Sequence, residues 1–273
     1  MTDRFGNARV FIVAGSDSGG GAGIQADLKA VMALGGYGAT AITALTAQNT
    51  RGVQDLHTVP PAFIRAQMAS VLDDIGADCI KTGMLHDTAV IEAVAEELET
   101  RAPGVPLVVD PVMVAQSGDR LLAEPAVAGL SRVLLPRAAL LTPNLPEAEV
   151  LLGREIAGAE AMAEAAAALR ELGPDAVLLK GGHAEGAEVV DCLATAEGVE
   201  CFRTPRIETT SRHGTGCTLA SAIAAGRAQG QDSRAAVVRG RAYLLEALRH
   251  ARGLGSGAGP VEHACHVPPF QGS

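Results

Sequence analysis

The chain has 273 residues, of which 48% are hydrophobic and 3% aromatic, and its formal net charge is −9. This length suits one large α/β domain or two small ones, and the composition indicates a globular protein whose core is built from aliphatic side chains. The acidic balance argues against nucleic acid or an anionic membrane as a partner, because both would require a basic patch.

Targeting signals are not evident. The apolar run near the start of the chain is too short for a signal peptide, and no segment approaches the ~18 apolar residues of a membrane span. The five cysteines offer neither a closely spaced metal pair nor a disulfide framework. Cys192 and Cys201 could face each other across a hairpin, but without a secretion signal we expect thiols. These features predict a cytoplasmic protein.

Segments typical of strands and helices alternate in chain order. We expect strands at 9–15, 39–45, 77–83, 106–112, 138–144 and 176–182, followed by a hairpin of strands 187–195 and 199–204. We expect helices at 22–34, 61–75, 88–101, near 124–134, at 145–152, at 159–172 and after Gly216. Apolar strands separated by helices indicate a parallel sheet covered on both faces. No linker divides the chain, so we expect a single domain over 1–273, with 252–263 as a surface loop.

The segment HGTGCT, residues 213–218, combines an anion site with a candidate base. Gly214 and Gly216 let the backbone turn tightly and bring N–H groups close to a ligand. The Ala- and Leu-rich run after them predicts a helix, whose positive N-terminal end suits a phosphate. Cys217 falls in its first turn, where we expect the dipole to favour the thiolate. The segment therefore points to phosphoryl transfer, although the residues alone also allow a glycine-capped loop with a buried structural cysteine.

Glycine-rich and polar segments follow six of the predicted strands. In open α/β sheets, ligands bind outside the carboxyl ends of the strands, so these segments should gather at one edge, beside Gly214. They are GSDSGGGAG, TAQNT, TGML, DPVM, TPNLPE and KGGH.

Oxygen-bearing side chains in these segments suit Mg²⁺, which reaches proteins through one or two carboxylates. Asp110, Asn144 and Glu147 are the candidates, and Lys180 is placed to bind the oxygens of a transferring phosphate. The alternatives are ordinary structural roles. Glu147 would then be a first-turn acid favoured by a helix dipole, and Lys180 a charge at the edge of the sheet.

The first glycine-rich loop lacks the Lys-Ser/Thr of a Walker A motif, so a loop closing over a small substrate fits better. Gln48 carries donors and an acceptor that can read the ring nitrogen and amino group of a heterocycle. Asp27 could meet a substrate hydroxyl or remain solvated. Met84 could form an adaptable apolar wall or belong to the core. His263, Cys265 and His266 are weak grounds for a zinc site, and we assign none.

In these motifs the chain resembles the hydroxymethylpyrimidine and phosphomethylpyrimidine kinases of thiamine biosynthesis, within the ribokinase-like superfamily. The resemblance covers nearly the whole chain and implies a three-layer αβα fold, ATP with Mg²⁺, two successive phosphorylations of one pyrimidine, and a homodimer. The segments that carry it are AGSDSGGGAGIQADLKA, ITALTAQNTRGVQ, KTGML, DPVMVAQSGDRLL, LLTPNLPEAEVLLG, VLLKGGH and HGTGCTLASAIAAG.

The resemblance also implies roles for individual residues. The expected substrate-binding residues are Gly15, Asp27, Gln48, Met84 and Val112. The expected ATP-binding residues are Asn144, Glu147, Lys180 and Thr215, with Asp110 and Glu147 at the metal. The expected catalytic residues are Lys180, as the lysine on the phosphate side, and Gly214, Gly216 and Cys217, where residues 214–217 supply the anion site and Cys217 the base.

The chain departs from the family pattern at three places: Ser211-Arg212 replaces Asn-Thr, Thr82 an aliphatic residue and Ala258 a histidine. None of these touches the proposed reacting groups.

Other functions remain open at this point. Pyridoxal kinase is the nearest, because pyridoxal is also a flat ring bearing a hydroxymethyl group. A non-catalytic sensor is another, and a cysteine-dependent hydrolase would need a histidine held against Cys217.

Overall fold

The architecture is that of an α/β protein with one central sheet. The computed structural model describes residues 8–113, 124–184 and 186–268. In this part of the chain nine strands lie in the order β3-β2-β1-β4-β5-β6-β7-β8-β9. Their bounds are β1 (Arg9–Asp17), β2 (Tyr37–Asn49), β3 (Gly52–Thr58), β4 (Cys79–Thr82), β5 (Leu107–Val109), β6 (Leu140–Leu141), β7 (Val177–Leu179), β8 (Glu188–Thr195) and β9 (Gly198–Pro205).

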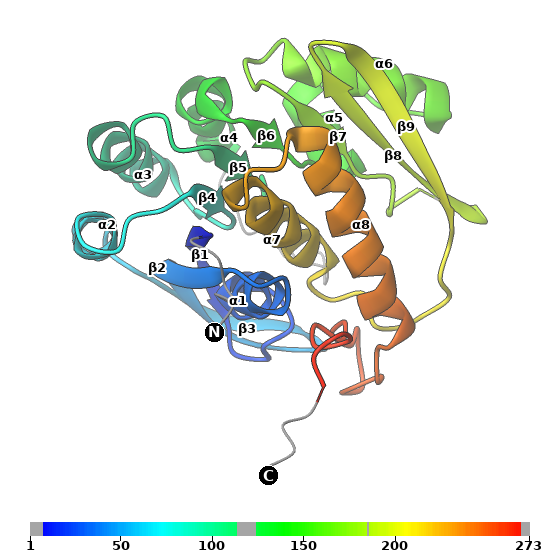
Figure 1. Cartoon of the computed structure of the whole chain (residues 1–273), viewed down its shortest axis with the longest axis horizontal. Coiled ribbons are helices and arrows are strands. Elements are labelled where there is room, and N and C mark those ends of the chain that lie inside the picture. The colour runs from blue at the N-terminus through cyan, green and yellow to red at the C-terminus, as the bar shows by residue number, and fades with distance from the viewer. Residues whose placement is uncertain (1–7, 114–123, 185, 269–273) are drawn as a thin grey trace.

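The six central strands, β2, β1, β4, β5, β6 and β7 in sheet order, pair in parallel. Strand β3 at one edge and strands β8 and β9 at the other pair antiparallel. Helices cover both faces (Figure 1), so the expected three-layer fold with a mostly parallel sheet is confirmed. The helices are α1 (Gly23–Ala33), α2 (Pro61–Leu72), α3 (Thr88–Arg101), α4 (Glu124–Val133), α5 (Leu145–Leu152), α6 (Gly158–Arg170), α7 (Thr215–Ala228) and α8 (Ser233–Arg249).

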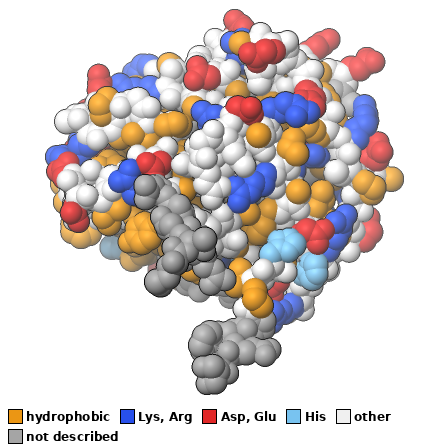
Figure 2. Space-filling view, in the orientation of Figure 1, with side chains coloured by type: hydrophobic (Ala, Val, Ile, Leu, Met, Phe, Trp, Pro, Cys, Tyr) orange, Lys and Arg blue, Asp and Glu red, His pale blue; other side chains and the backbone are white. Residues whose placement is uncertain are grey.

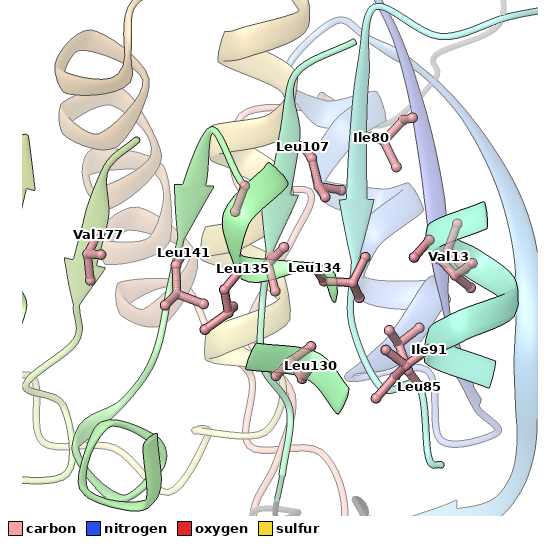
Figure 3. Close-up of a cluster of buried hydrophobic side chains, with 14 of the residues drawn as sticks. Val13, Ile80, Leu85, Ile91, Leu107, Leu130, Leu134, Leu135, Leu141 and Val177 are labelled. Atoms are coloured by element: carbon pink, nitrogen blue, oxygen red, sulfur yellow. The ribbon is translucent and has the colours of Figure 1, made fainter. Parts of the chain in front are cut away.

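The central strand β1 shows why both faces of the sheet are covered. Its side chains alternate between two apolar clusters: Val10, Ile12 and Ala14 pack toward α1, α7 and α8, and Phe11 and Val13 toward α2, α3 and α4. An aliphatic strand without polar alternation has no face for solvent, which favours parallel strands between two helical layers. Figure 3 shows one of these clusters, in which Val13 and other strand side chains meet leucines of the covering helices.

The structure adds two elements that the sequence reading missed, β3 and α8. The expected surface loop at 252–263 is confirmed in part, because residues 252–256 are exposed and belong to no helix or strand, whereas the end of the segment is buried. Val261 and His263 are buried there, and the backbone N–H of His213 donates to the carbonyl of Gly259 at 3.0 Å. This segment therefore packs against the start of α7 and supports it.

The β8–β9 hairpin forms as expected, but its two cysteines do not remain thiols. The register pairs Cys192 directly with Cys201, which brings their Cα atoms to 4.1 Å, and a disulfide joins them. The expectation of thiols was wrong because it rested on the absence of a secretion signal and gave no weight to cross-strand pairing. In the described part of the chain, no helix is both long enough and apolar enough to span a membrane.

Candidate active site

A cavity of ≈ 930 Å³ lies where β1, β4, β5, β6 and β7 end. This is the edge at which parallel α/β sheets bind ligands, and the volume suits a small ring together with a nucleotide. Every predicted site residue except Asp27 lines the cavity. These residues are Gly15, Gln48, Met84, Asp110, Val112, Asn144, Glu147, Lys180, Gly214, Thr215, Gly216 and Cys217.

Asp17 organises the first glycine-rich loop, a role that the sequence reading missed. Its carboxylate accepts hydrogen bonds from the backbone N–H groups of Gly19, Gly21 and Ala22 at 2.8–3.0 Å. It also contacts His213 Nε2 at 2.8 Å. Burial works to raise the pKa of Asp17, but the bonds from His213 and the loop amides outweigh it and lower the pKa. One carboxylate therefore holds the loop against the segment that precedes α7.

Gly214 caps the N-terminus of α7 in the left-handed region, with φ 80°. A Cβ at this position would lie 1.8 Å from the carbonyl oxygen of Gly21, so only glycine fits. The turn therefore brings the first glycine-rich loop into direct contact with the helix N-terminus, whose N–H groups lie beside the cavity. This arrangement suits an anion.

Cys217 lies in the first turn of α7 as predicted, but its expected low pKa is wrong. Burial raises the pKa of the thiol to about 12, and the ammonium of Lys81 opposes this only in part. The carboxylates of Asp27 and Asp110 raise the pKa further. Cys217 is half-buried in the cavity wall, and desolvation of its thiolate outweighs the favourable effect of the helix dipole.

Lys180, which follows β7, and Asp110, which follows β5, form an ion pair in the wall of the cavity. Lys180 Nζ lies 2.9 Å from Asp110 Oδ1, and the hydroxyl of Thr142 also donates to that oxygen. A Cβ on Gly216 would lie 3.2 Å from Lys180 Nζ, so the lysine faces the N-terminus of α7. The lysine and the helix N-terminus thus direct positive charge at the same part of the cavity.

Glu147 and Asn144 cap α5 reciprocally. The Glu147 carboxylate accepts from the Asn144 backbone N–H at 2.8 Å, and the Asn144 side chain accepts from the Glu147 N–H at 2.9 Å. Burial raises the pKa of Glu147 to about 7, and the Asp110 carboxylate adds to this although Lys180 opposes it. The structural role considered for Glu147 is therefore real, yet its carboxylate also lines the cavity.

Asp110 and Glu147 fit a magnesium ion. They present hard oxygens in one cavity, and the raised pKa of Glu147 reflects a carboxylate that a cation would stabilise. No cluster of three or more potential ligands occurs among the residues that the structure describes, as would be needed for a cage built from protein alone. Mg²⁺ needs no such cage, because waters and substrate phosphates complete its coordination. His263 contacts the hydroxyl of Thr218 at 2.9 Å, which gives it a structural role.

Asp27 lies away from both solvent and the cavity, contrary to either role expected for it. Its two carboxylate oxygens each lie 2.9 Å from Lys81 Nζ, and both side chains are fully buried. Asp27 therefore balances the charge of Lys81, a residue that the sequence reading did not select. A lysine inside an apolar four-residue strand was the signal that could have found it, since buried lysines are rare unless paired.

The other end of the cavity has an apolar wall and one adaptable amide. Gln48 Oε1 lies 3.1 Å from Thr46 Oγ1, whose hydroxyl also has the carbonyl of Ser16 as an acceptor at 2.9 Å. Met84 lies against Gly15, where a Cβ would come 2.3 Å from the methionine methyl. Val112 also lines this end, and the rest of its motif, residues 114–123, lies outside the described residues.

The cavity also extends beyond the predicted residues. Residues 182–184 and 204–209 and the side chains of Arg241, Leu244, Leu245 and Leu248 on α8 line it on the side of β8 and β9. Arg212, one of the departures from the family pattern, lines this side and donates to the carbonyl of Thr209.

On the face in view in Figure 2, acidic and basic side chains are interspersed.

The sequence model of the phosphomethylpyrimidine kinases matches residues 17–262. The chain belongs to this family. The hydroxymethylpyrimidine/phosphomethylpyrimidine kinase of Rhizobium meliloti is 51% identical over 254 residues, which are 92% of this chain and 95% of that protein. The thiamine biosynthesis bifunctional protein ThiED of Geobacter sulfurreducens is 51% identical over 95% of this chain, which spans 53% of the length of that relative.

Solved structures agree with this family assignment. The pyridoxal kinase of Bacillus subtilis, solved as an ADP complex, superposes with a TM-score of 0.87 at 34% identity, covering 94% of this chain and 98% of that one. Pyridoxal kinases are therefore structural relatives of this family. The cysteine-dependent hydrolase loses its basis, because His213 contacts Asp17 instead of Cys217.

Proposed function

We propose that this chain is an ATP-dependent kinase of thiamine biosynthesis. It phosphorylates 4-amino-5-hydroxymethyl-2-methylpyrimidine and then phosphorylates the monophosphate to the diphosphate. The observation that carries the proposal is that one cavity joins the anion site at Gly214–Cys217 and Lys180 to a ring-sized end lined by Gln48 and Met84. The 51% identity to a relative named hydroxymethylpyrimidine/phosphomethylpyrimidine kinase supports the choice of substrate.

ATP fits the side of the cavity that faces β8, β9 and α8. The structural relative that was solved as an ADP complex supports an adenine nucleotide as the ligand. Mg²⁺ would be held by Asp110 and Glu147, and when bound it neutralises the phosphate oxygens. Lys180 and the backbone N–H groups of residues 214–217 would hold the transferring phosphoryl group in position. These residues contribute positioning and positive charge, which are the main requirements of phosphoryl transfer.

The two phosphorylations make different demands on Cys217. In the first, the hydroxyl of the substrate must lose its proton as its oxygen attacks phosphorus, and Cys217 is the group in the anion site that can accept it. In the second, the attacking group is a phosphate whose second pKa is near ~6, so it is already ionised. The second step therefore needs the cations and the amides but no base.

Gln48 would recognise the ring. The carboxamide carries both donors and an acceptor, and the end that does not face Thr46 is available to a ring nitrogen or an amino group. We further propose that the chain acts as a single domain over 1–273, in the cytoplasm and as a homodimer, and sedimentation of the purified protein would test the last of these.

The decisive test is ATP consumption by the purified protein with Mg²⁺ and hydroxymethylpyrimidine, its monophosphate or pyridoxal, with the products separated by charge. Formation of both mono- and diphosphate from the pyrimidine is expected. Turnover of pyridoxal alone would favour the alternative, a pyridoxal kinase of vitamin B6 salvage, to which the superposition at a TM-score of 0.87 gives some support. Absence of turnover with all three would favour a non-catalytic sensor.

A further inference from the structure

The chain contains only three lysines, Lys29, Lys81 and Lys180, although it is rich in arginine. Lys29 is exposed on α1, but the other two lie in the cavity wall. Lys180 faces the N-terminus of α7 and has a role in the proposed function. Lys81 has none so far, although burying an ammonium is costly unless it is paired and hydrogen-bonded.

Lys81 is locked in place from three sides. Its side chain is 0% exposed, and Nζ lies 2.9 Å from each carboxylate oxygen of Asp27 on α1. Asp27 in turn accepts a hydrogen bond of 2.7 Å from the hydroxyl of Ser221 on α7. A Cβ on Gly83 would lie 2.9 Å from Lys81 Nζ, so the ammonium lies directly beneath that glycine. The charge is therefore fixed between α1, β4 and α7.

This fixed charge lies about one helical turn from Cys217. Cys217 and Ser221 are four residues apart on α7 and therefore share one face of the helix, and the Ser221 hydroxyl holds Asp27 of the ion pair. An ammonium has three N–H donors, and Asp27 is its sole hydrogen-bond acceptor among the described residues. The side chain of Lys81 has no exposed surface although the residue belongs to the cavity wall, so its charge is what it contributes to the site. The charged groups that influence the Cys217 thiol are Lys81 from β4, Asp27 from α1 and Asp110 after β5, and the Gly23 backbone also contacts it. Lys81 is the one among these charges that favours the thiolate.

We propose that Lys81 is a positioning residue for the first phosphorylation, and that its ammonium, fixed by Asp27 and Ser221, stabilises negative charge on Cys217 Sγ. The role assigned to Lys81 rests on the proposed function, because only an alcohol substrate needs the thiolate. The thiol first releases its proton to water. The hydroxyl proton of the substrate then moves to Sγ as the new O–P bond forms and the bond between the β- and γ-phosphates of ATP breaks, which releases ADP.

The first test measures the thiolate directly and needs no kinase activity. Iodoacetamide labelling of Cys217 at about pH 8, followed by peptide mass spectrometry, compares the wild type with the double variant D27N/K81M. This variant removes both charges together, so no unpaired charge stays buried. The ammonium of Lys81 lowers the pKa of the thiol more than the Asp27 carboxylate raises it, so removal of both leaves a net loss. We expect labelling of Cys217 to slow about threefold. Cys265, which lies outside the cavity, is the internal reference, and K29M is the matched lysine control.

Unchanged labelling of Cys217 in a folded D27N/K81M variant would overturn the proposal. If that variant does not fold, S221A serves instead, because it loosens the pair without removing a charge. We expect S221A to slow labelling in the same direction, and an unchanged rate would again overturn the proposal. Both measurements remain informative if the wild type turns over none of the proposed substrates, so failure of the proposed function is recognised separately.

The second test places Lys81 and Cys217 in one double-mutant cycle, with kcat and KM measured for each phosphorylation. D27N/K81M should lower kcat of the first phosphorylation about threefold, with little change in KM. The second phosphorylation should change little. In the C217A background, D27N/K81M should cause no further loss, because Lys81 acts through the thiol. Equal losses in the two phosphorylations, or additive losses in the cycle, would mean that the pair is merely structural.

Discussion

His213 Nε2 lies 2.8 Å from Asp17 Oδ2, and this contact joins residues that are 196 positions apart in the sequence. The same carboxylate oxygen accepts the backbone N–H groups of Gly21 and Ala22. The substrate loop and the anion site are therefore held together by one buried carboxylate. These bonds are all made within the protein, so they stabilise the relative placement of the two halves of the site.

Asp17→Asn should lower the free energy of unfolding by about 1–3 kcal/mol, because buried donors lose a charged acceptor. The folded state lowers the pKa of Asp17, so its contribution is present above the pKa of the unfolded carboxyl, near 3.8. It is lost as the pH falls below that value. Urea unfolding of both proteins across this acid range would show a smaller loss of stability in the variant than in the wild type.

Asp87→Asn is the matched control, because Asp87 caps α3 away from the cavity and accepts from the Val90 N–H. It should keep normal kinetics, whereas Asp17→Asn should raise KM for the pyrimidine. Normal KM in Asp17→Asn would mean that the loop does not need this anchor.

Gly214→Ala should lower kcat about 100-fold, because small displacements of reacting groups are costly. A left-handed alanine costs about 1–2 kcal/mol, and its Cβ would overlap the carbonyl oxygen of Gly21. Gly182→Ala is the control, since Gly182 lines the same cavity and a Cβ there would meet nothing within 4 Å. The measurement is kcat of both variants in steady-state kinetics. Equal kcat values would show that the close approach between Gly214 and Gly21 is not required.

Cys217→Ala should lower the rate of the first phosphorylation about 10²–10⁴-fold and leave the second within about threefold. Because the pKa of the thiol is raised to about 12, the thiolate fraction grows with pH throughout the neutral range. The ratio of first to second rates in the wild type should therefore rise with pH, and groups shared by both steps cancel in this ratio. Cys265→Ala is the control, and a ratio independent of pH would argue against a base.

Glu147→Gln should raise the Mg²⁺ concentration for half-maximal activity about tenfold or more. The folded state raises the pKa of Glu147 from 4.5 to about 7, so the protonated form is favoured by folding. Stability from this group is full below about pH 4.5 and declines as the pH rises toward 7. Thermal unfolding without Mg²⁺ should show this decline in the wild type, and saturating Mg²⁺ should reduce it. In Glu147→Gln, a decline as large as that of the wild type would assign the effect to another group.

Most elements of the fold were predictable because their patterns are local. Aliphatic strands such as 9–15 have no polar alternation, and the helices after them carry long apolar runs. Strand β3 was missed because its residues are exposed or half-buried at the edge of the sheet. Helix α8 was missed because arginines interrupt its apolar face, which becomes evident only when it packs on α7.

The site was predictable where a residue type is unusual for its place, as with Lys180 after an apolar strand. Partnerships were not, because they join residues distant in sequence. Asp27 was predicted to bind substrate because nothing near it in the sequence shows that it pairs with Lys81. The pKa of Cys217 depends on its burial, which the helix pattern does not reveal. Both errors come from reading a charge or a thiol without its tertiary surroundings.

The central position of β1 has a consequence for how the chain is made. On one face of this strand, Val10, Ile12 and Ala14 are covered in part by α7, which begins only at Thr215. During synthesis this apolar face therefore lacks part of its cover until most of the chain has left the ribosome. A nascent chain that is stopped before α7 leaves an apolar face of the central strand exposed to solvent. We therefore expect such fragments to aggregate or to bind chaperones, and the 273-residue chain to remain free of both.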